Sequence, residues 1–372
     1  MWMTLAYSYC ERPHAFSINV WTRLHVRLRN DSMMTSPFSS LHQSVAGRDC
    51  RRPIVFLFSG QGSQYYHMAR TLYHEHDDFR RIIERLDRQV QQHIGESMLS
   101  VLYDTRRDKG ELFDDVRFSH PAIFCVQYAL AEVLRKAGLV PDYVLGMSLG
   151  EFVAAAYSGV MTLEQALDAV LKQALTIEQF CPPGGMLAIL GSPALLKEYP
   201  DVFSGSELAG VNYEGHFVIA GHSSVLERIQ QFLHKREALY QLLPVKYGFH
   251  STLIDPAQRA YLDFLKTVHT NKPLIPVFSC YTGTQVLSYS SDHFWQVARK
   301  PMWFSAALQV LEAQSSKEHG LAYVDLGPGG TLANFVKRSL CSHSVSSFQS
   351  VITPFDQEVT RLQEMEKTFL HN

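Results

Sequence analysis

One serine and one histidine in this sequence have the setting that covalent catalysis requires. Ser148 lies between Gly146 and Gly150 in a Gly-x-Ser-x-Gly pattern, which is typical of a serine on a sharp turn between a strand and a helix. The glycines permit a backbone conformation that a Cβ atom would obstruct. Because a serine hydroxyl is a weak nucleophile near neutral pH, it needs a positioned base, and His250 is the candidate. This pair predicts chemistry through an acyl-serine intermediate.

The segments around Ser148 fit such a turn. A strand-like run covers 143–145, and a helical pattern of small residues covers 152–157. The amide of Leu149 would then face an oxyanion formed at Ser148, near the positive end of the following helix. The five-residue pattern alone is only moderately specific, since glycine and serine also coincide in ordinary loops.

Strands and helices alternate along most of the chain, which predicts an α/β fold. An apolar run at 54–58 leads into the loop Gly60-Gln61-Gly62-Ser63-Gln64 and then a helix from 68. From 182 to 244 the order becomes strand, helix, strand, strand, helix, strand, which predicts an inserted ferredoxin-like subdomain. The other predicted strands are 143–145, 277–281 and 322–326, and the other predicted helices are 121–137, 152–157, 163–180, 292–298 and 355–369.

This interpretation divides the chain into five parts. The large domain is predicted to be α/β-hydrolase-like with a parallel sheet, and the small subdomain interrupts it. The parts are an N-terminal extension at 1–50 that is disordered or precedes the true start, the large domain at 51–181 and again at 245–340, the small subdomain at 182–244, and a C-terminal tail or helix at 341–372.

Composition excludes several classes of protein. The 372 residues carry a net charge of −2, which gives no support for binding to nucleic acid or to a membrane surface. No apolar run approaches the length of about twenty residues that a membrane-spanning helix needs. The six cysteines lack C-x-x-C or metal-like spacing, so free thiols are expected. We therefore expect a cytoplasmic protein.

Four segments, taken in order, carry a family resemblance. They are Gly60-Gln61-Gly62-Ser63-Gln64, the turn at Ser148, Gly248-Phe249-His250-Ser251 and Gly327-Pro328-Gly329. With them the chain resembles the malonyl-CoA:acyl-carrier-protein acyltransferases over roughly 53–340. The resemblance implies their fold, the small subdomain included, and thioester substrates on a phosphopantetheinyl acyl carrier protein or on coenzyme A. It implies no metal and no bound cofactor.

The resemblance also implies roles for individual residues. The other ring nitrogen of His250 would be oriented by a backbone carbonyl from near 301–304, so no acidic third residue is required. The amides of Gln61 and Leu149 would bind the oxyanion, although the glutamine loop could also be a plain turn. The positions expected to contact substrate are Phe249, Asn212, Met147 and Gln173.

Two of these positions depart from the family pattern. Malonyl-loading members carry an arginine roughly twenty-five residues after the serine, where this chain has Gln173, with Lys172 beside it. Burial of a carboxylate without that partner would cost about 2–5 kcal/mol. Met147 stands where the family has histidine, which means either a packing change or a drier acyl pocket. Both departures favour uncharged acyl groups such as acetyl.

Together these features resemble the acyltransferase-like acyl hydrolases of trans-acyltransferase polyketide synthases. The predicted function is release of stalled, uncharged short acyl groups from acyl carrier proteins. An acyl-CoA:carrier acyltransferase that loads acetyl or another starter unit would show the same residues and stays open. A generic α/β-hydrolase esterase and a catalytically inactive docking protein are the less favoured alternatives.

Overall fold

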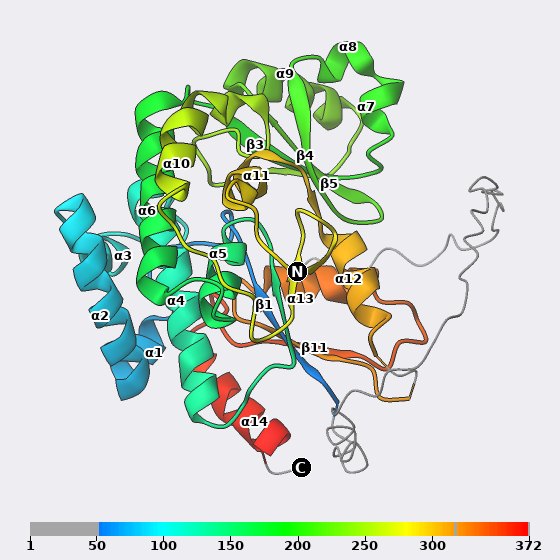
Figure 1. The fold of residues 1–372 in the computed structure, drawn as a ribbon. Coiled ribbons are helices and arrows are strands. Elements are labelled where there is room, and N and C mark those ends of the chain that lie inside the picture. Colours follow the sequence, from blue (N-terminus) through cyan, green and yellow to red (C-terminus); the bar gives the residue numbers. More distant parts are fainter. Residues whose placement is uncertain (1–51, 316–317, 371–372) are drawn as a thin grey trace, which may run out of the picture. The chain divides into compact units, whose positions relative to one another are not determined.

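A six-stranded, mostly parallel sheet forms the centre of the fold (Figure 1). The computed structural model describes residues 52–315 and 318–370, so the predicted extension at 1–50 lies outside the described residues. The strand order is β11-β10-β1-β2-β7-β8. The strands are β1 (Ile54–Phe58), β2 (Tyr143–Gly146), β7 (Val277–Ser279), β8 (Thr284–Val286), β10 (Ala322–Asp325) and β11 (Ser347–Ser350).

The edge strand β8 is the exception to the predicted parallel sheet. It pairs with β7 in the antiparallel direction, with Val277 opposite Val286. Only four residues separate the two strands, and Gly283 adopts a positive φ of 68° in that turn. A connection this short makes a hairpin, because a parallel pair needs a crossover of a dozen or more residues.

Both faces of the central sheet are covered. All five residues of β1 are buried, as expected of a strand that packs against helices on each side. Phe56 and Phe58 belong to a core with α4 (Val116–Lys136), α5 (Gly150–Tyr157) and α6 (Leu163–Phe180). The alternate residues Val55 and Leu57 pack into a second core with α12 (Phe304–Glu312) and α13 (Thr331–Ser339).

A second sheet of five strands lies above the first in the view of Figure 1. Its order is β6-β3-β5-β4-β9, and four of its strands follow the order predicted for 182–244. These are β3 (Gly185–Leu190), β4 (Ser206–Tyr213), β5 (His216–Gly221) and β6 (Tyr240–Leu242), with helices α7 (Leu195–Glu198), α8 (Pro200–Phe203) and α9 (Ser223–Lys235). The fifth strand, β9 (Met302–Trp303), was not predicted and comes from beyond the predicted subdomain.

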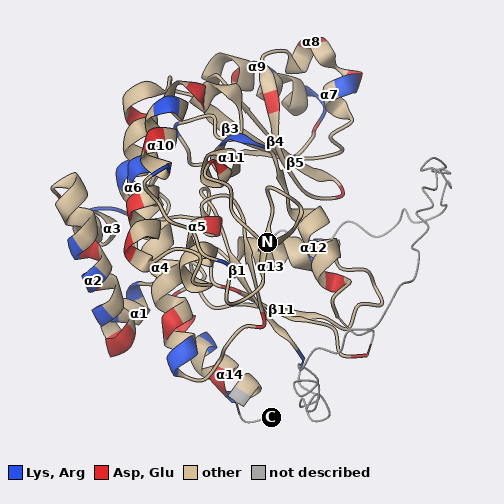
Figure 2. Ribbon diagram, viewed as in Figure 1, with Lys and Arg blue, Asp and Glu red and all other residues tan. Residues whose placement is uncertain are grey.

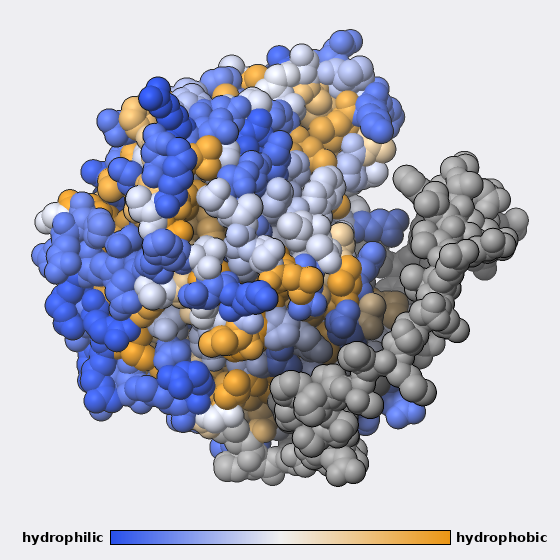
Figure 3. Space-filling view, viewed as in Figure 1, coloured by the Kyte–Doolittle hydropathy of each residue, from blue (hydrophilic) through white to orange (hydrophobic). Residues whose placement is uncertain are grey.

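The remaining helices surround the two sheets. They are α1 (Arg70–Glu75), α2 (Asp77–Ile94), α3 (Met98–Leu102), η1 (Thr252–Ala257), α10 (Gln258–Leu265), α11 (His293–Arg299) and α14 (Glu358–Leu370). Acidic and basic residues alternate along the outer helices rather than gathering by sign (Figure 2), and apolar residues form small separate groups on the face in Figure 3. No helix in the described ranges is long and apolar enough to cross a membrane. Cys125, Cys181, Cys280 and Cys341 are free thiols, as predicted.

Candidate active site

Ser148 occupies a sharp turn between β2 and α5. Its φ is +54°, which is unusual for a residue with a side chain. The turn packs so closely on β1 that a Cβ atom on Gly150 would overlap the carbonyl oxygen of Phe58. The Met147 amide also donates to that carbonyl at 2.9 Å. Glycine is therefore required at position 150, because the backbone of β1 occupies the space that a Cβ atom would need.

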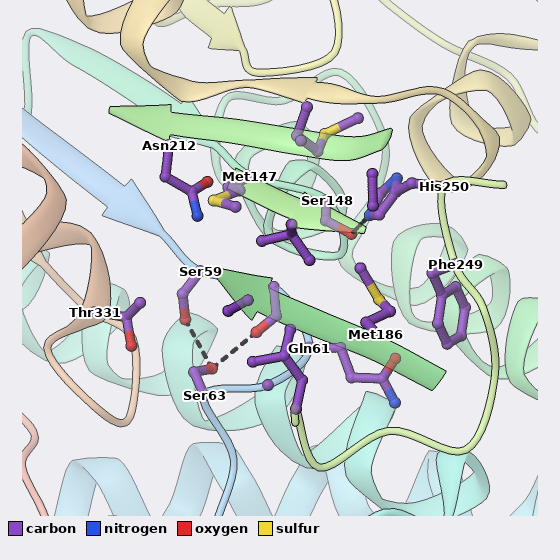
Figure 4. A pocket seen from close by; sticks show the side chains of 18 of the residues that line it. Ser59, Gln61, Ser63, Met147, Ser148, Met186, Asn212, Phe249, His250 and Thr331 are labelled. Atoms are coloured by element: carbon purple, nitrogen blue, oxygen red, sulfur yellow. Dashed lines mark hydrogen bonds between the residues drawn. The ribbon is translucent and has the colours of Figure 1, made fainter. Parts of the chain in front are cut away.

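His250 meets Ser148 at hydrogen-bond distance. The His250 Nε2 lies 3.0 Å from Ser148 Oγ, and the two side chains point toward one another in Figure 4. The His250 Nδ1 lies 2.9 Å from the carbonyl oxygen of Lys300. A carbonyl can only accept, so Nδ1 carries the hydrogen and Nε2 is free to accept the Ser148 proton. The orienting carbonyl thus comes from the residue just before the predicted 301–304 segment.

The surroundings of His250 keep its ring neutral. The residue is buried, and burial lowers the pKa of its imidazole to about 4, partly opposed by the Lys300 carbonyl. The backbone amide of His250 donates to the Ala298 carbonyl at 2.9 Å, and φ is +60°. Such a backbone costs about 1–3 kcal/mol and is found where the surrounding structure holds a functional group in place. A neutral imidazole is the form that a general base requires.

Two backbone amides near Ser148 are placed to bind an oxyanion. Leu149 is the residue immediately before α5, at its positive end. The loop that carries Gln61 approaches so closely that a Cβ atom on Gly60 would lie 2.8 Å from the Met147 carbonyl oxygen and 2.8 Å from Ser148 Cβ. Within the described chain, neither the Gln61 nor the Leu149 amide donates a hydrogen bond to another residue.

Side chains that the sequence analysis did not single out hold the Gln61 loop. Ser63 Oγ donates to the Gly60 carbonyl at 2.8 Å and lies 3.0 Å from Ser59 Oγ (Figure 4). Gln127 on α4 accepts from the Ser59 amide at 2.7 Å and donates to its carbonyl at 3.0 Å. Gln64 donates to the Phe113 and Pro244 carbonyls. Ser63 and Gln64 belong to the loop sequence itself, where their polar side chains were the available signal for such contacts. Gln127 comes from α4 instead.

A cavity of about 260 Å³ between the two sheets brings most of the predicted site residues together. The predicted residues that line it are Gln61, Met147, Ser148, Asn212, Phe249 and His250. Asn212 lies on β4 of the second sheet, and its Nδ2 lies 2.9 Å from Nδ1 of His216 on β5. His216 also lines the cavity, and sequence analysis did not predict it. Met147 both lines the cavity and packs on the apolar core, so the two meanings given for it are compatible.

A second, much smaller chamber holds the other two predicted residues. Leu149 and Gln173 line it together with Gln61, Ser148 and Phe249. Gln173 is 4% exposed, whereas the neighbouring Lys172 is exposed on the outer side of α6. No Lys, Arg, Asp or Glu is among the described residues that line either cavity. Gln173 and Ser148 thus line the same chamber.

Comparison with known proteins gives three informative matches and a family. A family model described as the acyl transferase domain matches residues 55–371. The chain is 46% identical over 314 residues to the polyketide biosynthesis acyltransferase homolog PksD of Bacillus subtilis, covering 84% of this chain and 96% of that protein. It is 45% identical over 319 residues to BaeD of Bacillus velezensis, described in the same words, covering 86% and 97%. Among solved structures, the acyltransferase domain from the second module of the salinomycin polyketide synthase matches with a TM-score of 0.73 and 26% identity, covering 84% of this chain and 72% of that one.

Proposed function

Because this chain belongs to the family of acyl transferase domains, as its sequence predicted, we propose that it is a stand-alone enzyme of polyketide biosynthesis and a proofreading acyl hydrolase. It would release uncharged short acyl groups, such as acetyl, from acyl carrier proteins. The relatives matched over almost their whole length are named for polyketide biosynthesis. The observation that carries the proposal is the chamber beside Ser148, which Gln173 lines and whose described lining contains no charged side chain. The family resemblance implies an arginine at this position in malonyl-loading enzymes.

The proposed reaction uses His250 twice. In the first half, His250 Nε2 takes the Ser148 proton, and Oγ attacks the thioester carbonyl. The amides of Gln61 and Leu149 stabilise the oxyanion, and the carrier thiol leaves with the proton from His250. In the second half, His250 deprotonates a water that attacks the acyl-serine, and Ser148 regains the proton. The thioester and one water thus become a carboxylic acid and a free carrier thiol.

The substrate preference follows from charge. A malonyl group bound at Ser148 would place its carboxylate among neutral side chains, because the described lining of both cavities contains no cation. A buried carboxylate without a charged partner binds about 30- to several-thousand-fold more weakly than one with it. Acetyl carries no such penalty.

A starter-unit acyltransferase is the second candidate. The printed names of the relatives say acyltransferase homolog, and the same Ser148 and His250 pair could pass the acyl group to a second thiol. Coenzyme A would then be a donor. A generic esterase is not proposed, since the family match extends over residues 55–371.

We propose an acyl carrier protein as the partner. Its phosphopantetheine arm would enter the 260 Å³ cavity between the sheets. Three exposed basic residues suit an acidic carrier: Lys300, next to the His250 loop, and Lys337 and Arg338 on α13. The strand order β6-β3-β5-β4 supports a ferredoxin-like small subdomain.

The test is intact-protein mass spectrometry of acetyl-carrier and malonyl-carrier proteins incubated with the enzyme. Each is run with and without an unloaded second carrier, and Ser148→Ala is the control. Conversion of acetyl-carrier to free thiol while malonyl-carrier persists supports the hydrolase. Movement of the acyl group to the second carrier with little hydrolysis would make the enzyme a loading transferase instead.

A further inference from the structure

The small chamber behind Ser148 contains more hydrogen-bonding groups than the proposed reaction uses. It is lined by four polar residues, Gln61, His120, Ser148 and Gln173, and otherwise by apolar residues. The volume open to the centre of a water molecule is about 10 Å³, which is room for about one water. His120 comes from α4 and has no role in the mechanism above.

Most side-chain polar atoms of the residues that line this chamber have no hydrogen-bond partner among the described residues. Both side-chain polar atoms of Gln61, both ring nitrogens of His120 and Nε2 of Gln173 are buried and make no hydrogen bond with any described residue. Gln173 lies near the Tyr261 hydroxyl, where its side chain partly opposes the rise that burial causes in the pKa of that group, and the hydroxyl itself donates to the Ala169 carbonyl at 3.0 Å. Buried polar groups left unpaired are destabilising. A water or a substrate group that enters the chamber and forms hydrogen bonds with these atoms would remove that cost.

The group that pairs with these buried atoms must be neutral. Burial lowers the pKa of His120 to about 3, so its imidazole is uncharged and offers one donor and one acceptor. The two glutamine amides are also uncharged. A water, a hydroxyl or a ketone oxygen fits this set, whereas a carboxylate would be buried without a cation.

The position of His250 decides which part of a substrate reaches the chamber. His250 lines the large cavity and is not among the residues of the small chamber. Since His250 must protonate the leaving thiol, the carrier arm lies on the side of the large cavity. The acyl chain on Ser148 then extends toward Gln61, His120 and Gln173.

We propose that Gln61, His120 and Gln173 form a hydrated polar subsite that selects acyl groups with a neutral oxygen on their third carbon, namely 3-hydroxyacyl and 3-oxoacyl groups. This deepens the proposed function and rests on it. Acetyl has no third carbon and leaves the water in place. A 3-oxygen replaces the hydrogen bonds of that water, whereas an aliphatic chain displaces the water and replaces none of them. His120 is the residue that this subsite adds to the site.

The test compares kcat/KM for acetyl, butyryl and both enantiomers of 3-hydroxybutyryl on the same carrier protein. For the unmodified enzyme we expect one 3-hydroxybutyryl enantiomer to exceed butyryl by about 10- to 100-fold. His120→Leu removes the donor and the acceptor, and should reduce this preference to below about threefold. His120→Gln keeps one donor and one acceptor and should retain the preference.

Two controls separate a binding role from a structural one. The His120 ring lies 5.4 Å from the Phe249 ring, centroid to centroid, so the melting temperature and the pH profile of acetyl cleavage are measured for both variants. Equal or faster turnover of butyryl than of both hydroxybutyryl enantiomers, in an enzyme that cleaves acetyl, would overturn the subsite alone. Loss of the preference in His120→Gln as well as in His120→Leu would also overturn it. Failure to form any acyl-Ser148 would overturn the subsite and the proposed function together.

Discussion

Replacement of Gln173 by arginine is the sharpest test of the charge argument. Gln173 is buried on α6 and lines the chamber that also contains Ser148. An arginine there would present a planar fork that pairs with a carboxylate through two hydrogen bonds. We therefore expect Gln173→Arg to raise malonyl turnover relative to acetyl turnover.

The size of the effect follows from the site. A buried, hydrogen-bonded carboxylate and guanidinium pair is worth about 2–5 kcal/mol relative to the unpaired carboxylate, or roughly 30- to 4,000-fold. The chamber has only about 10 Å³ open to a water centre, so the longer side chain must push its neighbours apart. Overpacking costs about 1–3 kcal/mol. Subtracting this cost leaves about 1–2 kcal/mol, so the expected rise in the ratio of malonyl to acetyl turnover is about 5- to 30-fold.

The assay measures initial rates on malonyl-carrier and acetyl-carrier proteins by intact-protein mass spectrometry. Gln173→Met is the matched control, since it has similar length without charge, and it should leave the ratio unchanged. Gln173→Lys supplies charge without the fork and should give a smaller gain. The charge argument would be refuted by efficient malonyl turnover in the unmodified enzyme. It would equally be refuted by a ratio that rises less than about threefold in a folded Gln173→Arg enzyme that still acylates Ser148.

Three further predictions concern the base, the oxyanion loop and the fold. Because the free-enzyme pKa of His250 is lowered to about 4, kcat/KM for thioester cleavage should stay level from pH 8 to about 5 and fall as the pH drops through about 4; a midpoint near 6.5 would contradict the burial argument. Gly60→Ala places a Cβ atom 2.8 Å from the Met147 carbonyl and should lower kcat about 10²- to 10³-fold by moving the Gln61 amide, whereas unchanged kcat in a folded variant would remove that amide from the mechanism. Asp325 accepts from the Gly327 and Ala333 amides at 2.8 and 2.9 Å, so Asp325→Ala should lower the free energy of unfolding by about 2–4 kcal/mol in urea denaturation; a loss below about 0.5 kcal/mol would show that the turn holds without it.

The sequence predicted elements with strong periodicity and missed those that depend on tertiary contacts. Helix 163–180 and strand 54–58 agree with the structure to the residue. The two-residue strand β9 has no period of its own, and it forms only because Gly210 on β4 lies beside Met302.

Helix α4 shows how a local rule misplaced a boundary. The helical spacing of apolar residues predicted a helix from 121, where a proline suits the first turn. The helix begins earlier, at Val116, because the Asp115 side chain caps it by accepting from the Arg117 amide. Pro121 therefore lies inside the helix, and His120 lies on it rather than before it.

The candidate site was predictable where a local pattern fixes a role. Ser148 lies in a five-residue turn pattern, and His250 lies in a segment shared with the family. His120 could not be found in this way, because nothing near it in the sequence distinguishes it from a core residue. Only the packing of α4 against Phe249 brings it behind the serine.

Under the proposed mechanism, the identity of the acyl group and the identity of its acceptor would be decided in different cavities. In the proposed mechanism the small chamber would contact the acyl chain, whereas the large cavity would receive the carrier arm and then either water or a second thiol. The two cavities have only Gln61, Ser148 and Phe249 in common. His250 serves both half-reactions with the same nitrogen, so it favours neither acceptor by position. Selectivity measured with Gln173 and His120 variants therefore holds for a hydrolase and for a transferase alike, and the choice between them depends on what enters the large cavity after the carrier thiol has left.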